Sequence, residues 1–309
     1  MGEKGADFVA AFGKTASDYA YTDCLTDTDW AWEFLRLSPA YRNDYIESYA
    51  KLTRGIIHPS GIKIYRARGR HDKARRWGLS AFTEPGLNAQ ETHVFWSQDT
   101  LSYSVLAASS RVPAPRKESD FDLFQDKNCC AILCDDHYQK IILRSRNAAL
   151  DMKLVGANVL FSPVILQFHL DGFAKISSGT KALIWTRNAL KSQLTGDKKA
   201  LTRTAKMHRK KCLIALKCYL KGASLRDIGN VFRAYGLTRL SWSSSGDEAL
   251  KKQVWRCRNM GLKLMHSIFV TPQTRKSSSI FFPQLETMNT RIRKRTCNSK
   301  IKRYQILNF

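Results

Sequence analysis

The sequence lacks any long apolar run. No stretch of its 309 residues approaches the roughly 18–20 uninterrupted apolar residues that a membrane-spanning helix needs. The first residues also contain too short an apolar run for a secretory signal. With 43% hydrophobic and 25% charged residues, the composition is typical of a folded chain with a core, which excludes a collagen-like or fully disordered protein. We therefore expect a cytoplasmic protein without a membrane partner.

The chain also lacks the short motifs of common catalytic sites. It has no GxSxG nucleophile elbow, no Walker A loop, no HExxH zinc motif and no close group of carboxylates that would hold two metal ions. Asp135, Asp136 and His137 form an acidic–histidine cluster, which a hairpin turn explains more simply. We expect a protein that is not an enzyme and that uses no cofactor.

The eight cysteines include no CxxC pair. Cys129, Cys130 and Cys134, followed by His137, suggest a zinc site, but no second ligand cluster accompanies them. The segment CCAILC is also typical of a buried strand in which cysteine acts as a small hydrophobic residue, and we prefer this interpretation. A long chain without an export signal does not favour a disulfide framework.

Acidic residues are scarce in the C-terminal third of the chain. Residues 200–309 contain 24 Lys and Arg against four acids, whereas residues 1–199 contain 27 against 22. The formal charge of +25 therefore belongs mostly to one end. A basic region joined to a near-neutral body is typical of a nucleic-acid-binding module on a scaffold, because a general solubility charge would be spread more evenly.

Two short helices are predicted near the N-terminus. Asp29 is a plausible N-cap for the first, in which Trp30 and Phe34 recur at helical spacing. Ser38 and Pro39 then begin the second, as N-cap and first helical residue. So small a hairpin cannot bury a core alone, and we expect it to dock on another part of the chain.

Short apolar or alternating runs in the middle of the chain predict β-strands. They lie at residues 129–134, 140–144, 150–155 and 164–170, with turn residues between them. Their richness in Ile, Val and Phe favours strands over helices. We expect a small antiparallel β-meander.

Two consecutive helices are predicted after residue 204. The first ends at Gly222, a natural residue to follow a helix. Ser224 and Asp227 give the second the S-x-x-D pattern of a capping box, and Gly236 ends it. Two helices joined by a three-residue turn are typical of the first part of a helix-turn-helix. A longer connection follows, in which Trp242 is expected to fold back on the core.

The third helix of this region, predicted over residues 247–265, has two unlike faces. Its apolar face consists of Leu250, Val254, Cys257, Gly261 and Leu264, and its polar face of Lys252, Arg256, Asn259 and Lys263. Arg pairs bidentately with guanine and Asn with adenine, so Arg256 and Asn259 are the candidates for reading bases. Lysines suit phosphate contacts, which position a protein without reading sequence. An ordinary solvated helix face has the same pattern, and this alternative stays open. The predicted DNA-binding residues are Lys251, Lys252, Arg256, Arg258, Asn259, Lys263, Ser224 and Arg226.

These segments resemble a family of alphaproteobacterial transcriptional-regulator-like proteins found on integrative and conjugative elements. The N-terminal resemblance lies in DWAWEFLRLSPAYRNDY and RRWGLSAF, and the C-terminal one in VLFSPVILQFHLDG, KGASLRDIGNVF and ALKKQVWRCRNMGLKLM. The resemblance implies a DNA-binding regulator, since some relatives activate genes for element excision and transfer and others act as antagonists. The chain departs from the family at its end, where residues 271–309 add nine Lys and Arg against one acid.

Together these patterns predict an α+β protein with a small N-terminal helical module, an antiparallel β-meander, a C-terminal helix-turn-helix-like domain and a basic tail. The predicted segments are a flexible arm (1–25), a regulator-like helical module (26–110), a linker (111–120), a β-rich module (121–186), a helix-turn-helix-like DNA-binding domain (187–265) and a disordered basic extension (266–309). The predicted function is sequence-specific regulation of mobile-element excision or transfer genes. The alternative is an antagonist that binds a related regulator. The expected partners are double-stranded DNA and either a related regulator or a second copy of the chain.

Overall fold

The structure is a computed structural model of the full chain. It describes residues 3–48, 51–68, 71–97, 104–111, 121–124, 129–144, 149–169, 202–240, 242 and 247–267, and four single positions between 180 and 187. The predicted basic extension lies outside these residues beyond Ser267, and so does the predicted linker beyond Arg111. Among the described helices, none is long and apolar enough to cross a membrane.

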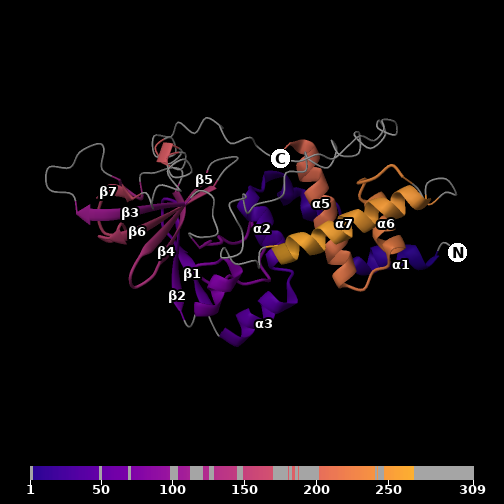
Figure 1. The fold of residues 1–309 in the computed structure, drawn as a ribbon, viewed down its shortest axis with the longest axis horizontal. Helices are drawn as coiled ribbons and strands as arrows, with labels where there is room; N and C mark the ends of the chain where they lie inside the picture. Colours follow the sequence, from indigo (N-terminus) through magenta and orange to yellow (C-terminus); the bar gives the residue numbers. More distant parts are fainter. Residues whose placement is uncertain are drawn as a thin grey trace, which may run out of the picture.

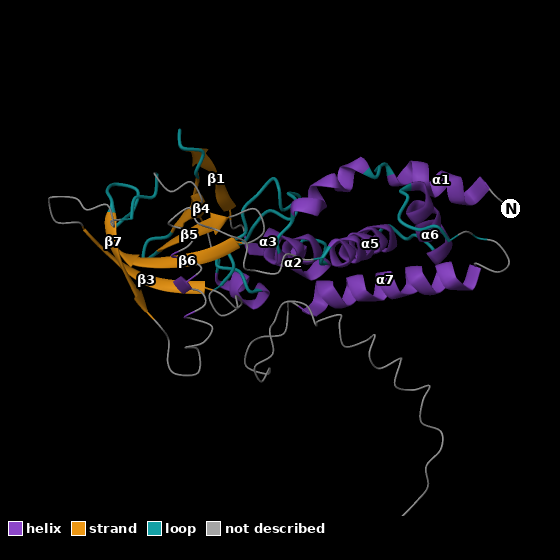
Figure 2. Ribbon diagram, turned by 90° about the horizontal axis from the view of Figure 1, so that it is seen from above, coloured by secondary structure: helices purple, strands orange, loops and turns teal. Residues whose placement is uncertain are grey.

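The chain forms a sheet at one end and a group of helices at the other, which confirms the α+β class (Figures 1 and 2). The strands are β1 Lys51–Ile57, β2 Lys63–Arg68, β3 Ser104–Arg111, β4 Cys129–Cys134, β5 Gln139–Arg144, β6 Ala149–Gly156 and β7 Val164–His169. The helices are α1 Glu3–Phe12, α2 Asp27–Leu35, α3 Pro39–Ser48, α5 Arg203–Leu220, α6 Leu225–Ala234 and α7 Asp247–Ser267, with 3₁₀ helices η1 Ser17–Cys24 and η2 Asp72–Trp77.

The sheet is mixed, and it is larger than the predicted meander. Its strand order is β1-β2-β4-β5-β6-β3-β7. Strands β4, β5 and β6 form the predicted antiparallel meander, but β7 pairs with β3 instead of β6. Two pairs, β2 with β4 and β6 with β3, are parallel. The predicted meander is confirmed for β4, β5 and β6, but the placement of β7 beside them was wrong. Strands β1, β2 and β3, which come from the segment predicted to be helical, complete the sheet.

Residues 1–25 contain a helix and a 3₁₀ helix, so the prediction of a flexible arm was wrong. Phe12 and Tyr19 are buried. The Lys221 Nζ donates a hydrogen bond to the Phe12 carbonyl at 3.2 Å and lies over the Phe12 ring. The Tyr235 hydroxyl donates to the Lys14 carbonyl. The segment lacks a clear hydrophobic period of its own, and contacts with residues 200 positions further along the chain fix it instead.

The two predicted N-terminal helices are present, with one change of cap. Thr26, and not Asp29, is the N-cap of α2, because Asp29 occupies the third helical position and completes a capping box with Thr26. The second helix begins at Pro39 as predicted, and the Tyr41 backbone N–H donates to Ser38 Oγ at 3.3 Å.

A single hydrophobic core joins the two ends of the chain. It includes Trp30 and Phe34 of α2 together with Leu213 and Leu216 of α5 and Val254 of α7, all with 0% exposure. The N-terminal hairpin thus docks on the C-terminal helices, and Figure 2 shows α2 beside α5 and α7. Leu220, the last residue of α5, is exposed.

Ion pairs reinforce this arrangement on both sides of α2. The Arg209 guanidinium of α5 donates to Asp27 Oδ1 at 2.7 Å, and the Arg144 guanidinium of β5 donates to Asp29 Oδ1 at 2.7 Å. Helix α2 therefore lies between the sheet and the C-terminal helices. Within it, the fully buried Glu33 accepts hydrogen bonds from Arg36, the C-cap residue of the helix.

Candidate nucleic-acid interface

Helices α5 and α6 are joined as the sequence predicted. Gly222 follows α5 with φ of +84°, a left-handed conformation that costs glycine little. Ser224 caps α6 and forms a capping box with Asp227: the Ser224 hydroxyl lies 2.7 Å from Asp227 Oδ2. Ile228 and Phe232 supply the buried side of α6.

Helix α7 presents its predicted apolar face to the core. Leu250, Val254, Cys257 and Leu264 are buried against α5, α6 and α2. At Gly261 the α7 backbone approaches α5 so closely that a Cβ atom would lie 2.8 Å from the Cys212 carbonyl oxygen. A glycine at this position therefore sets the distance between the two helices.

Trp242 folds back on α6, as predicted. Its ring lies over Gly229, where a Cβ atom would come within 2.3 Å of the indole. The indole Nε1 donates to Asn230 Oδ1 at 2.8 Å. Trp242 thus attaches the connection between α6 and α7 to the body of the helical half.

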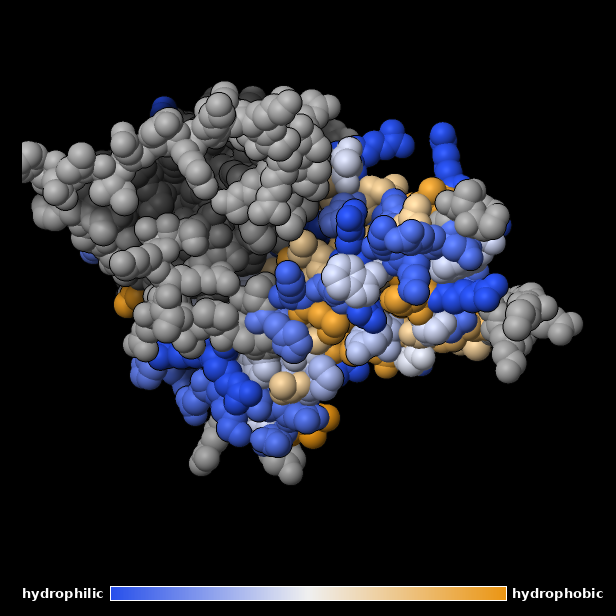
Figure 3. Space-filling view, turned by 45° about the vertical axis from the view of Figure 1, so that its right-hand side comes forward, coloured by the Kyte–Doolittle hydropathy of each residue, from blue (hydrophilic) through white to orange (hydrophobic). Residues whose placement is uncertain are grey.

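The polar face of α7 lies on the surface. Lys251, Lys252, Arg256 and Lys263 are exposed, and Trp255 beside them is 50% exposed. Figure 3 shows hydrophilic side chains gathered over the helical half, with hydrophobic residues between them. Residues 200–267 contain 15 Lys and Arg against three acids, so this segment brings a net positive charge to the helical half.

Four of the predicted contact residues are engaged within the protein. Arg258 donates to Asn259 Oδ1 through Nε at 3.1 Å and through Nη2 at 3.0 Å, and its guanidinium lies over the Tyr219 ring. Ser224 is held in its capping box, and the Arg226 guanidinium lies 6.0 Å from the centre of the Trp242 ring. Asn259 is only half-exposed, and its amide oxygen is already an acceptor.

One further predicted residue has a weaker internal contact. The Lys252 ammonium pairs with Glu248 Oε1 at 2.5 Å, one helical turn earlier on α7. Both side chains are more than half exposed, so the pair is screened by water and contributes little to stability. Lys252 can exchange this partner for a phosphate at small cost.

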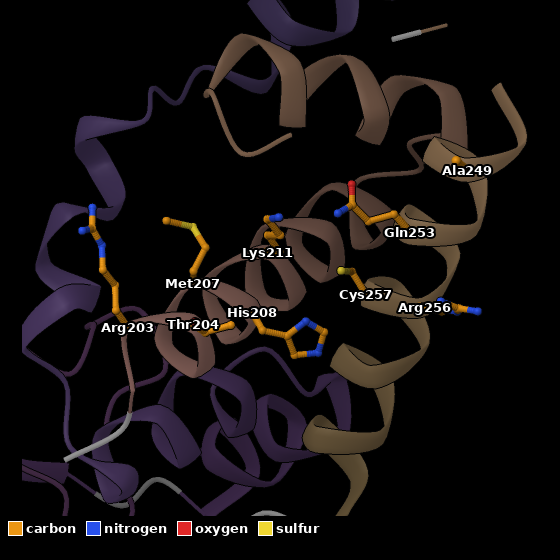
Figure 4. Close-up of a pocket in the computed structure, with 9 residues that line it drawn as sticks. All are labelled: Arg203, Thr204, Met207, His208, Lys211, Ala249, Gln253, Arg256 and Cys257. Atoms are coloured by element: carbon orange, nitrogen blue, oxygen red, sulfur yellow. The ribbon is translucent and has the colours of Figure 1, made fainter. Parts of the chain in front are cut away.

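A hollow of about 580 Å³ separates parts of α5 and α7. Its lining residues are Arg203, Thr204, Met207, His208, Lys211, Ala249, Gln253, Arg256 and Cys257 (Figure 4). Arg203 and Lys211 of α5 thus add positive charge beside Arg256. Neither residue is among the predicted contacts, because only the packing of α5 against α7 places them beside Arg256, although the basic run RTAKMHRKK was a usable signal.

The hollow also contains a cluster of metal-ligating side chains that sequence reasoning missed. The donor atoms of His208, Cys212 and Cys257 all lie within 4.8 Å of one another. His208 and Cys212 are four residues apart on α5, a spacing that places both on one helix face. The third member comes from α7, 45 positions later in the chain, and only the packing of the two helices reveals it.

One comparison with known proteins identifies the N-terminal part of the chain. Residues 13–80, which span η1, α2, α3, β1, β2 and η2, match the description "Proteobacterial transcriptional regulator-like domain". Residues 13–80 are thus similar to transcriptional regulators of this family. This match confirms the resemblance at the level of that family and supports a role in transcription regulation. Comparisons with curated proteins and with solved structures find no match.

Proposed function

We propose that the protein is a sequence-specific DNA-binding transcription regulator that reads DNA with the exposed face of α7. The observation that supports this most is the division of α7 into two faces. Its apolar face docks on α5, α6 and α2, while Lys251, Lys252, Arg256 and Lys263 face solvent. A helix held on one side and cationic on the other suits entry into a major groove.

The side-chain contacts refine the proposed roles. Arg256 is exposed and suits bidentate pairing with guanine, whereas Asn259 would first have to release Arg258 before its amide could pair with adenine. Arg256 is therefore the main proposed base reader. Lys251 and Lys263 are proposed phosphate contacts, and Arg203 of α5 extends the same basic surface.

The similarity of residues 13–80 to transcriptional regulators supports a regulatory role, but it does not identify the target genes. The proposed genes are those for excision or transfer of a mobile element, and this choice rests on the family resemblance alone. The proposed role is binding, without catalysis. A second copy of the chain is the proposed protein partner, because a dimer would read two half-sites.

Fluorescence anisotropy with DNA from around the gene tests the proposal. The full chain should bind one fragment much more tightly than a scrambled one, and its affinity should fall steeply with salt. Arg256→Ala should weaken specific binding by about 1–3 kcal/mol, or roughly 5- to 150-fold, and relax the preference at one base position. Arg75→Ala is the matched control, because Arg75 is an exposed arginine of η2 near Tyr138 of the sheet end.

Point variants are preferable to deletion of residues 200–309. That deletion would remove α5 and α7 and uncover Trp30 and Phe34, so loss of binding would only report unfolding. If the folded full chain binds no DNA but retains a related regulator in a pull-down, and Arg256→Ala does the same, the antagonist function is correct and the DNA-reading function is wrong.

A further inference from the structure

The side chains of His208, Cys212 and Cys257 meet where α5 and α7 approach most closely. The Cys212 Sγ and the His208 Nε2 are 3.6 Å apart. The two cysteines are 0% and 2% exposed, whereas His208 borders the hollow and is half-buried. Figure 4 shows the His208 ring and the Cys257 side chain pointing into the space between the two helices.

The backbone contributes to this juxtaposition. Gly261, one turn beyond Cys257 on α7, lies directly against the Cys212 carbonyl, where any larger residue would force the helices apart. The glycine thus brings α7 close to α5 at the level of the two thiols. Buried cysteines often serve as small hydrophobic residues, but that role does not require an imidazole beside two thiols.

The distances fit a tetrahedral ion. An ion bound at about 2.3 Å by sulfur and about 2.0 Å by nitrogen holds those two atoms about 3.6 Å apart, which is the separation of Cys212 Sγ and His208 Nε2. Small side-chain rotations within the 4.8 Å group would bring Cys257 to the same distance. We propose that His208, Cys212 and Cys257 bind a zinc ion that links α5 to α7.

The chemistry of the surroundings supports this ion class. Two thiolates and one imidazole are ligands that zinc prefers over the harder calcium and magnesium ions.

The fourth coordination position would face the hollow. Gln253, one turn before Cys257, lines this hollow, and its buried amide oxygen has no hydrogen-bond partner among the described residues. A water in the hollow could both complete the zinc shell and donate a hydrogen bond to this amide oxygen. The nearby Arg203, Lys211 and Arg256 would favour an anionic fourth ligand.

Cobalt substitution tests the site on the full chain under reducing conditions. Titration with Co²⁺ should give thiolate-to-cobalt charge-transfer absorption that saturates at one equivalent and is displaced by Zn²⁺. Cys257→Ser and His208→Ala should each lose or strongly weaken this absorption. Cys218→Ser is the matched control, because Cys218 is a buried cysteine of α5 outside the cluster, and it should keep the signal.

A stability measurement keeps the test valid if a variant folds poorly. Zinc at about one hundred times its Kd should raise the Tm of the parent by about 4–8 °C and leave the Tm of His208→Ala nearly unchanged. Absence of charge-transfer absorption in the parent would overturn the proposal, as would equal absorption in folded Cys257→Ser. A Cys212–Cys257 disulfide in protein purified without oxygen would also overturn it and identify the pair as a redox site.

Discussion

Glu33 offers the most direct test of how the regulator-like domain is held together. Its carboxylate is fully buried and accepts four hydrogen bonds: one from the Tyr21 hydroxyl at 2.8 Å, two from Arg36 at 3.0 and 2.9 Å, and one from the Ala89 backbone N–H at 2.9 Å. Arg36 also donates to the Pro85 carbonyl at 3.4 Å. The network therefore attaches α2 to the segment that follows η2.

Glu33→Gln keeps the shape of this side chain but removes its charge. If the amide oxygen takes the place of Oε2, it can still accept from Tyr21 and Arg36, but Arg36 then lacks its counter-charge. The NH₂ group in turn faces the Ala89 backbone N–H, donor against donor. Breaking a buried pair by removing one partner costs about 3–5 kcal/mol. Because part of the network survives, we expect Glu33→Gln to lower the free energy of unfolding by about 2–4 kcal/mol.

Urea unfolding followed by tryptophan fluorescence measures this loss, with an unchanged m value as the sign that the folded state is retained. Glu47→Gln is the matched control: Glu47 pairs with Lys73 at 3.2 Å, but both side chains are more than half exposed, so the change should stay within about 0.5 kcal/mol. Adding Arg36→Met to Glu33→Gln should recover at least about 1 kcal/mol, because no unpaired buried charge remains. Additive losses, or a Glu33→Gln variant as stable as the parent, would refute the reasoning.

Three further substitutions test other contacts. Gly261→Ala should lower the free energy of unfolding by about 1 kcal/mol. Overpacking against Cys212 costs about 1–3 kcal/mol, and the higher helix propensity of alanine offsets about 1 kcal/mol of that cost. A variant more stable than the parent would contradict the close approach to Cys212. Burial, with Arg144 and Lys63 nearby, lowers the pKa of His93 to about 3, so stability present above pH 6.5 is lost as the pH falls toward 3. Between pH 7 and pH 5 the parent should lose about 2 kcal/mol of its free energy of unfolding through His93, and His93→Gln should not show this loss in urea titrations. An equal pH dependence in both proteins would show that His93 is not the source. Trp242→Ala should lower the Tm by a few degrees, as calorimetry can check, and no change would mean that its indole does not hold α6.

The C-terminal helices could be predicted closely because their signals are local. The S-x-x-D capping box at Ser224, Gly222 and Gly236 after their helices, and the apolar period of residues 250–264 each depend on neighbours within one or two turns. The structure ends α7 at Ser267, two residues beyond the predicted boundary.

The sheet could not be predicted in the same way. Strand β2 has the sequence KIYRAR. Its buried and exposed side chains tend to alternate, but its three charged residues hide this alternation in the sequence. Its parallel pairing with β4 joins Lys63 to Ala131, and no property of either segment alone specifies that register. The metal-ligating cluster was missed for a related reason, since Cys257 meets Cys212 only through the packing of two helices.

The shared core has a consequence for folding during translation. The Asp27–Arg209 contact joins residues 182 positions apart. At about 5–20 residues per second, a ribosome needs roughly 10–35 s to add that stretch. Until then the side of α2 that α5 and α7 cover stays without its partners, and apolar surface of this kind promotes aggregation. Translation of α5 through α7 thus completes this core, and nascent chains stopped before α5 should accumulate on chaperones.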